Sequence, residues 1–237
     1  MQKGRHNKKN QVAAQLRKQV LTLAFAPGAV LDEALLSEQY GLSRTPLREV
    51  FQRLAGEGYL NLETNRGASV SSMDFDTMRA FFQCAPMVYA AIARLATEQA
   101  TLGQINDIKK IQQRFSQSVR TDSAEDMAMH NYRFHEQLGV MSASPYLKPS
   151  LERLLIDHTR MSHRFYRTDR EDSLKRVREA CDQHEQMIES ISNRTPAVTV
   201  ELTLQHWELS RYEIDKYVQP DPLPADALES PAEVFLK

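Results

Sequence analysis

The chain has 237 residues, a length that fits one large domain or two modest ones. Hydrophobic residues make up 41% of it and charged residues 26%, as in ordinary globular proteins. No apolar run approaches the length that crosses a bilayer, and the opening MQKGRHNKKN lacks the apolar core of a signal peptide, so no membrane partner is expected. The isolated cysteines Cys84 and Cys181 speak against a disulfide framework or a thiolate metal cluster and favour a reducing cytoplasm.

Charge is distributed unevenly along the chain. The formal net charge is −1, but residues 1–72 sum to +4 and residues 73–237 to −5. A basic first part joined to an acidic second part predicts that only the first part contacts nucleic acid.

The first 72 residues follow the pattern of a winged helix-turn-helix. Residues 1–10 are polar and basic and are expected to form a flexible arm. Three helices and two strands follow, with an Asn65-Arg66-Gly67 wing tip between the strands. The helices are expected from Val12 to before Pro27, at 33–40 and at 43–57, and the strands at 59–62 and 68–71.

The third of these helices has the features of a recognition helix. Ser43 is a good N-cap residue, and Pro46 lies in the first turn, where proline is tolerated. Arg44, Thr45 and Arg48 lie at its amino end, where a helix-turn-helix protein reaches base edges and phosphates. They lie off the apolar stripe, which consists of Leu47, Val50, Phe51 and Leu54.

After residue 72 only helical patterns remain, which predicts an all-α bundle. Gly103, Pro145 and Pro196 punctuate it where helices start or stop. The fold class is therefore mostly α, with domains at 1–72 and 73–218 and a disordered, proline-rich tail at 219–237. The six predicted helices span 75–101, 104–120, 123–140, 145–168, 171–194 and 196–218.

Three histidines and an asparagine are expected to point into this bundle. Asn131 and His135 are four residues apart and share one helix face. His184 lies beside an inward stripe, and His206 lies at a similar height in the next, antiparallel helix. Three imidazoles and an amide oxygen could bind a divalent metal such as zinc, nickel, copper or iron. Ordinary hydrogen-bonded core histidines are the alternative that spacing leaves open.

Two further side chains are weaker candidates. His158 follows a leucine stripe in helical phase and could line the same cavity. Arg160, with Arg164 and Arg167, is expected on a solvated face, although one of these arginines could instead neutralise an anionic effector.

These residues together resemble a known family. The stretch PGAVLDEALLSEQYGLSRTPLREVFQRLAGEGYL, with a wing that ends in NRGASV, is similar to the GntR family of bacterial transcription regulators. NYRFHEQL, then SPYL, HEQMIESI and a histidine in the last helix resemble the FCD ligand-binding domain of that family's FadR-like branch. The resemblance covers about residues 11 to 218.

The resemblance implies roles for residues of this chain at the DNA. The positions of Arg44, Thr45 and Arg48 contact operator DNA in the family, and Ser43 begins the same helix. Gly67 matches the wing tip that enters the minor groove, with Arg66 beside it as a phosphate contact.

The resemblance also implies a metal site and its ligands. Asn131, His135, His184 and His206 match the four protein ligands of a divalent metal, for which zinc is the first choice and nickel or another transition metal the alternative. Many relatives have Asp where this chain has Asn131, so the metal should bind more weakly and an anionic effector slightly better. Tyr89 and Ala85 stand where many relatives carry Glu and Arg, so no effector identity is carried over; Tyr89 stays a candidate effector contact with His158 and Arg160.

The function predicted from the sequence is a ligand-responsive regulator. It would be a cytoplasmic, nucleoid-associated bacterial homodimer, usually a repressor, that senses a small carboxylate through its metal. The alternatives are the same DNA-binding role with a metal-free effector pocket, and a metal-dependent enzyme with a DNA-binding appendage. Glu136 and Glu185 are the acids next to the ligands, and helix geometry turns each away from the metal, which disfavours the enzyme.

Overall fold

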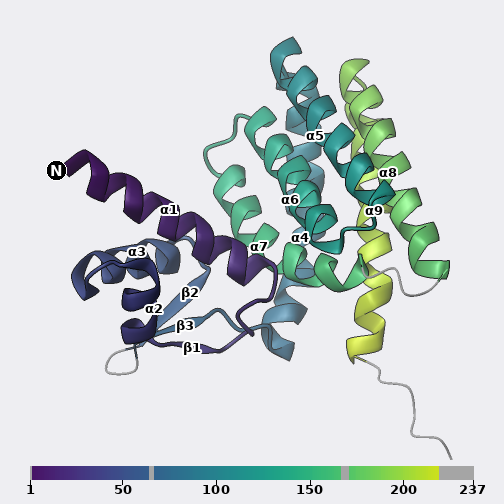
Figure 1. Ribbon diagram of the computed structural model, residues 1–237. Helices are drawn as coiled ribbons and strands as arrows, with labels where there is room; N and C mark the ends of the chain where they lie inside the picture. The colour runs from purple at the N-terminus through teal and green to yellow at the C-terminus, as the bar shows by residue number, and fades with distance from the viewer. Residues whose placement is uncertain (1, 64–66, 167–170, 219–237) are drawn as a thin grey trace, which may run out of the picture.

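A computed structural model describes residues 2–63, 67–166 and 171–218 of the chain. A small winged head is followed by a bundle of long helices, as Figure 1 shows at its left and right. The predicted mostly α fold, a winged helix-turn-helix followed by six helices, is confirmed.

The head consists of three helices and a three-stranded antiparallel sheet. Ser69 of the middle strand lies opposite Val30 on one side and Asn61 on the other. The elements are α1 (Gln2–Leu21), β1 (Val30–Leu31), α2 (Glu33–Tyr40), α3 (Arg44–Gly56), β2 (Leu60–Glu63) and β3 (Gly67–Val70), with the strand order β1-β3-β2.

Local chemistry sets the ends of α2 and α3. The Asp32 carboxylate accepts the Ala34 and Leu35 amides at 2.7 and 3.0 Å and so caps α2. Gly41 ends that helix in the left-handed conformation, with φ of 55°. Ser43 occupies the N-cap position of α3, as predicted, but its side chain makes no capping hydrogen bond there.

One expectation about the head is wrong, and one strand was missed. Residues 2–10 belong to α1 rather than to a flexible arm, because α1 is anchored: Lys8 Nζ donates to the Gly41 carbonyl at 2.8 Å and Lys9 pairs with Glu49 at 2.6 Å. The two-residue strand β1 was not predicted, since so short a segment has no alternating pattern. The wing-tip residues 64–66 lie outside the described residues.

The bundle contains all six predicted helices. The second and third bundle helices begin at capping residues whose side chains bind free backbone amides. Thr101 forms a capping box with Gln104, and the Ser123 hydroxyl accepts the Asp126 amide. The helices are α4 (Phe75–Gln99), α5 (Leu102–Arg120), α6 (Ala124–Met141), α7 (Leu147–Phe165), α8 (Glu171–Ser192) and α9 (Pro196–Val218).

Helix α4 runs through the bundle and packs against α6, α7, α8 and α9. By length and composition alone, α4 could cross a membrane. The expectation that no apolar stretch is long enough to cross a bilayer therefore does not hold for α4. The core helix of a globular bundle can have the same length and composition, and α4 contacts four other helices of the bundle, although its most apolar stretch is only 39% buried. Its apolar character is therefore weak evidence for a membrane span.

The head rests on α7 and α6 of the bundle. Ile156 of α7 belongs to the buried core of the head, and Tyr132 of α6 packs against the cores of both parts. Gly58, at φ of 89°, allows a close approach here, because a Cβ on it would collide with the Arg153 side chain. The boundary at residue 72 stays a prediction, and the predicted tail at 219–237 lies outside the described residues.

Candidate metal centre

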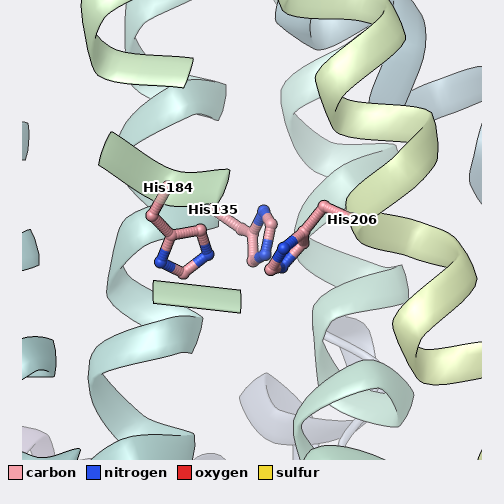
Figure 2. A group of neighbouring side chains, drawn as sticks. All are labelled: His135, His184 and His206. Atoms are coloured by element: carbon pink, nitrogen blue, oxygen red, sulfur yellow. The ribbon is translucent and has the colours of Figure 1, made fainter. Parts of the chain in front are cut away.

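Three histidines from three helices converge inside the bundle, as Figure 2 shows. One ring nitrogen from each of His135, His184 and His206 can be chosen so that all lie within 4.8 Å of one another. Their side chains come from α6, α8 and α9, and none of the three residues is more than 5% exposed. The predicted convergence of these residues is therefore present in the structure.

Two glutamines fix how two of the rings are oriented. Gln112 Oε1 lies 3.0 Å from His184 Nδ1, and Gln183 Oε1 lies 3.0 Å from His206 Nδ1. Because an amide oxygen only accepts, each Nδ1 carries the proton, and each Nε2 keeps its lone pair. Phe134 stacks on the His184 ring at 3.8 Å between centroids and holds its plane. Such outer partners are typical of metal-ligating histidines.

Three ring nitrogens of the cluster, and one amide oxygen a helical turn before His135 on α6, are buried without a hydrogen-bond partner among the described residues. They are Asn131 Oδ1, both ring nitrogens of His135 and Nε2 of His184. Buried polar atoms nearly always have a partner, so three ring nitrogens without one in a single cluster, with an amide oxygen one helical turn away, need an explanation. Nitrogen and amide oxygen lone pairs are ligands that a divalent transition metal accepts, and the donor set therefore fits such an ion.

Tyr89 and His158 border the cluster on the side of α4 and α7. The Tyr89 hydroxyl lies 2.6 Å from His158 Nδ1, and the His158 ring centroid lies 5.1 Å from that of His135. His158 thus lies where its helical phase predicted. All these side chains are at most 5% exposed, so a molecule larger than an ion reaches them only if surrounding helices move.

Arg160 lies elsewhere and in a different environment from the predicted one. It is 1% exposed, so the expected solvated face is wrong for this residue. Its guanidinium group faces the segment between β3 and α4 instead of the histidines. Arg167 and the side chain of Arg164 lie outside what the structure describes.

Burial keeps the imidazoles of the cluster neutral. Desolvation, followed by the charges of neighbouring histidines, lowers the pKa of His135 and of His184 far below the ordinary 6.5. Desolvation also lowers the pKa of His158 to about 4 and, together with the His158 charge, that of His206 to about 3. A neutral imidazole is the form that binds metals.

These pKa values predict that metal-free protein loses stability in acid. Below pH 6.5 the unfolded chain binds protons at these histidines while the folded chain does not, so the free energy of unfolding falls as the pH drops from about 6.5 toward 4. Each unit of pKa difference contributes about 1.4 kcal/mol. Urea unfolding of chelator-treated protein at several pH values measures it. The loss should be smaller in His206→Gln, and an identical pH profile for this variant would contradict the assignment.

The predicted DNA-contacting residues lie at the exposed start of α3. Arg44 and Thr45 are exposed, and the exposed Arg48 side chain pairs with Glu33 of α2 at 3.0 Å. Gly67 opens β3 with φ of 78°, which suits a tight wing. Arg66 lies outside the described residues.

Sequence reasoning missed the two orienting glutamines. Gln112 is fully buried in the row Ile105, Ile108 and Phe115, where a polar residue interrupts an apolar stripe. That interruption was the available signal. Gln183 had no comparable signal, because it lies beside a charged face of α8.

A winged helix-turn-helix head followed by a helical bundle is the architecture of a DNA-binding regulator with a second, helical domain. The comparisons with known proteins agree with this class. Residues 8–70 match the bacterial regulatory proteins of the gntR family, and residues 86–209 match the FCD domain. The chain belongs to the GntR family and carries an FCD effector-binding domain, and proteins of this family are transcriptional regulators and not enzymes.

Relatives and solved structures agree with this assignment. The chain is 24% identical over 139 residues to the uncharacterized regulator YdhC of Bacillus subtilis, covering 58% of this chain and 62% of that one. It is 21% identical over 204 residues to the gluconate operon transcriptional repressor of B. subtilis, covering 83% and 81%. The chain thus spans less than two thirds of the length of YdhC. Escherichia coli McbR/YncC has the same fold, with a TM-score of 0.73, 20% identity and coverage of 90% and 97%.

Proposed function

We propose that this regulator is a homodimeric repressor whose operator binding is set by a metal and a small organic acid in the FCD domain. The buried polar orphans around His135, His184 and Asn131 are the observation that carries the proposal. In this proposal the protein acts in the bacterial cytoplasm and belongs to the FadR-like branch of the family.

Asn131, His135, His184 and His206 would hold the metal, with zinc as the first choice and nickel or another transition metal as alternatives. Three imidazoles and an oxygen donor suit these ions, and a bound ion would offer a positive centre to a carboxylate. Gln112 and Gln183 keep the Nε2 lone pairs of two ligands available.

The effector would be a small carboxylate that binds beside Tyr89 and His158. Tyr89 offers a hydroxyl, and desolvation raises its pKa far above the ordinary value, so it stays protonated and can donate a hydrogen bond. Arg160 is not proposed as an effector contact, because its guanidinium group is bonded at the segment between β3 and α4.

The operator would be read by the amino end of α3 and by the wing. Arg44, Thr45 and Arg48 would enter the major groove from a helix begun at Ser43, while Gly67 and Arg66 would lie at the minor groove. Two heads of a dimer would read a short pseudo-palindrome.

The dimer would form through the outer face of α4. Only 39% of the most apolar stretch of this helix is buried, and Ala80, Cys84 and Met87 form an exposed row along it. Met87 is 69% exposed. Apolar residues left on one helix face are typical of subunit interfaces.

Met87→Glu is therefore expected to convert the dimer to monomers, because two charges would be buried against each other across the interface. Light scattering during gel filtration measures the mass. Leu102→Glu is the matched control, since Leu102 is 79% exposed but lies on α5. A monomeric wild type, or a dimeric Met87→Glu variant, would refute the α4 interface.

The function is tested with DNA selected by the protein from a random duplex library. Fluorescence anisotropy with the selected duplex, with and without zinc and a panel of small carboxylates, gives the affinity in each state. The expected result is specific binding that changes when a carboxylate is added to zinc-loaded protein. The same carboxylate response after complete zinc removal would support the metal-free pocket instead.

A further inference from the structure

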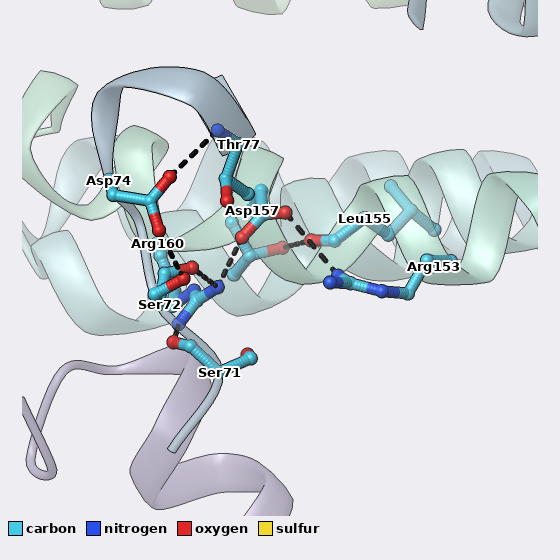
Figure 3. Close-up of polar contacts among 9 residues, drawn as sticks. Ser71, Ser72, Asp74, Thr77, Arg153, Leu155, Asp157 and Arg160 are labelled. Carbon is cyan, nitrogen blue, oxygen red and sulfur yellow. Dashed lines mark hydrogen bonds and ion pairs between the residues drawn. The ribbon is translucent and has the colours of Figure 1, made fainter. Parts of the chain in front are cut away.

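Arg160 of α7 joins the bundle to the segment that leaves the head. Its Nη1 donates to the Ser71 carbonyl at 2.7 Å and its Nη2 to the Ser72 carbonyl at 3.4 Å, and Nη2 also pairs with Asp157, as Figure 3 shows. Both charged side chains are at most 5% exposed. A buried guanidinium group with three partners is a rigid connection, since charge-assisted hydrogen bonds are strong and a buried charge cannot be left unpaired.

The segment that Arg160 holds is tied to both parts of the molecule. It contains the four residues between β3 and α4. The Ser71 amide donates to the Tyr59 carbonyl of the head at 3.0 Å. The Ser72 hydroxyl donates to Asp74 at 2.7 Å, and Asp74 in turn accepts the Thr77 amide and caps α4. A displacement of this segment therefore moves the head relative to α4.

The same stretch of α7 also borders the histidine cluster. His158 is two residues before Arg160, so the two side chains leave the helix in nearly opposite directions. His158 contacts Tyr89 and His135, and Ile156 one half-turn earlier lies in the core of the head. One rigid turn of helix thus contacts the histidine cluster, the head and the connecting segment.

We propose that Arg160 is the positioning residue that fixes the orientation of the head, and that a shift of α7 at the histidine cluster reaches the head through it. This inference rests on the proposed function, in which the cluster binds the ligand and two heads read one operator. Packed helices move as units, so a shift of α7 near His158 carries Arg160 and its two carbonyl partners with it.

The test compares full-length wild type with Arg160→Met, the paired variant Asp157→Asn/Arg160→Met, and Arg194→Met. The paired variant removes both charges, because in Arg160→Met the buried Asp157 would keep only the half-exposed Arg153, at 3.3 Å, as a charged partner and could prevent folding. Arg194→Met is the matched control: Arg194 also donates to two backbone carbonyls, those of Thr97 and Ala100, but far from the head.

The first measurement is hydrogen–deuterium exchange of ligand-free protein. In both Arg160 variants, amides of residues 71–74 should exchange about tenfold faster, with α3 and α9 unchanged. Arg194→Met should leave this segment as in wild type. Unchanged exchange at 71–74 in the Arg160 variants, or equal acceleration throughout the chain, would overturn the positioning role.

The second measurement compares a selected two-half-site duplex with a single half-site. A loosened head lowers the effective concentration of the second head at its half-site, so the paired variant should lose about ten- to hundredfold in affinity for the full site and none for the half-site. Equal losses on both duplexes would indicate damaged heads and overturn the proposal.

The third measurement adds zinc alone, after its uptake by each variant has been measured. Zinc should alter exchange in α7 of every variant, but at residues 71–74 only in wild type and Arg194→Met. A wild-type response at 71–74 in the paired variant, or none in zinc-loaded wild type, would overturn the coupling. A wild type that takes up no zinc would refute the proposed metal site, while the first two measurements still decide the role of Arg160.

Discussion

His184→Ala and His135→Ala are each expected to lower the affinity for zinc by at least about a hundredfold, because loss of a ligand should cost more than loss of an outer partner. Nε2 of His184 and both ring nitrogens of His135 have no hydrogen-bond partner among the described residues. Isothermal titration and metal analysis of purified protein measure the change. The residues that would read DNA are unchanged in both variants, so the head of each should still bind duplex DNA.

His130→Ala is the matched control for this expectation. It removes an imidazole from the same helix as His135 whose Nδ1 also has no partner among the described residues, but this residue is half-buried and lies outside the cluster. Its zinc affinity should equal that of wild type. Asn131→Asp should bind zinc more tightly, because a carboxylate adds a negative charge to the donor set. Equal zinc content in wild type and both alanine variants would refute the site.

Arg44→Ala and Arg48→Ala should each reduce affinity for the selected operator by about ten- to hundredfold. Each arginine would contact either a base or a phosphate of the operator, and a bidentate contact to a base is worth about 1–3 kcal/mol. Anisotropy at several salt concentrations separates the two. A lost phosphate contact lowers the salt slope, whereas a lost base contact relaxes sequence preference.

Arg53→Ala is the matched control for the recognition arginines. Arg53 lies on the same helix, but its side chain bonds Glu57 and Asn10 at the far end from Ser43. It should keep operator affinity, and the recognition variants should keep wild-type zinc affinity. Wild-type operator affinity in both Arg44→Ala and Arg48→Ala would contradict the assignment of α3.

Most of the fold could be predicted from the sequence because its signals are local. The apolar period, the caps and the prolines around the bundle helices are read within one turn, and α2 was predicted to the residue. The strand β1 escaped because its pairing with β3 is a contact between residues almost forty positions apart. The start of α1 escaped because Lys8 and Lys9 are anchored by distant partners.

In the candidate site, too, the features set by local sequence were predicted and those set by distant contacts were not. Burial of His135, His184 and His206 followed from helical phase, which is local. The environment of Arg160 did not, because a guanidinium group is ordinarily exposed and its partners are two backbone carbonyls that no side-chain pattern reveals. The residue type of Arg160 therefore did not reveal that its side chain bonds backbone carbonyls of a distant segment.

Because of Ile156, the head and the bundle are expected to unfold together. This residue is supplied by a bundle helix and fully buried in the core of the head, so the head alone would expose the apolar surface that Ile156 covers. Heating is then expected to melt head and bundle together in one cooperative transition rather than one after the other. For the same reason, this head could be exchanged with that of a relative only if the residue facing it on α7 were exchanged as well.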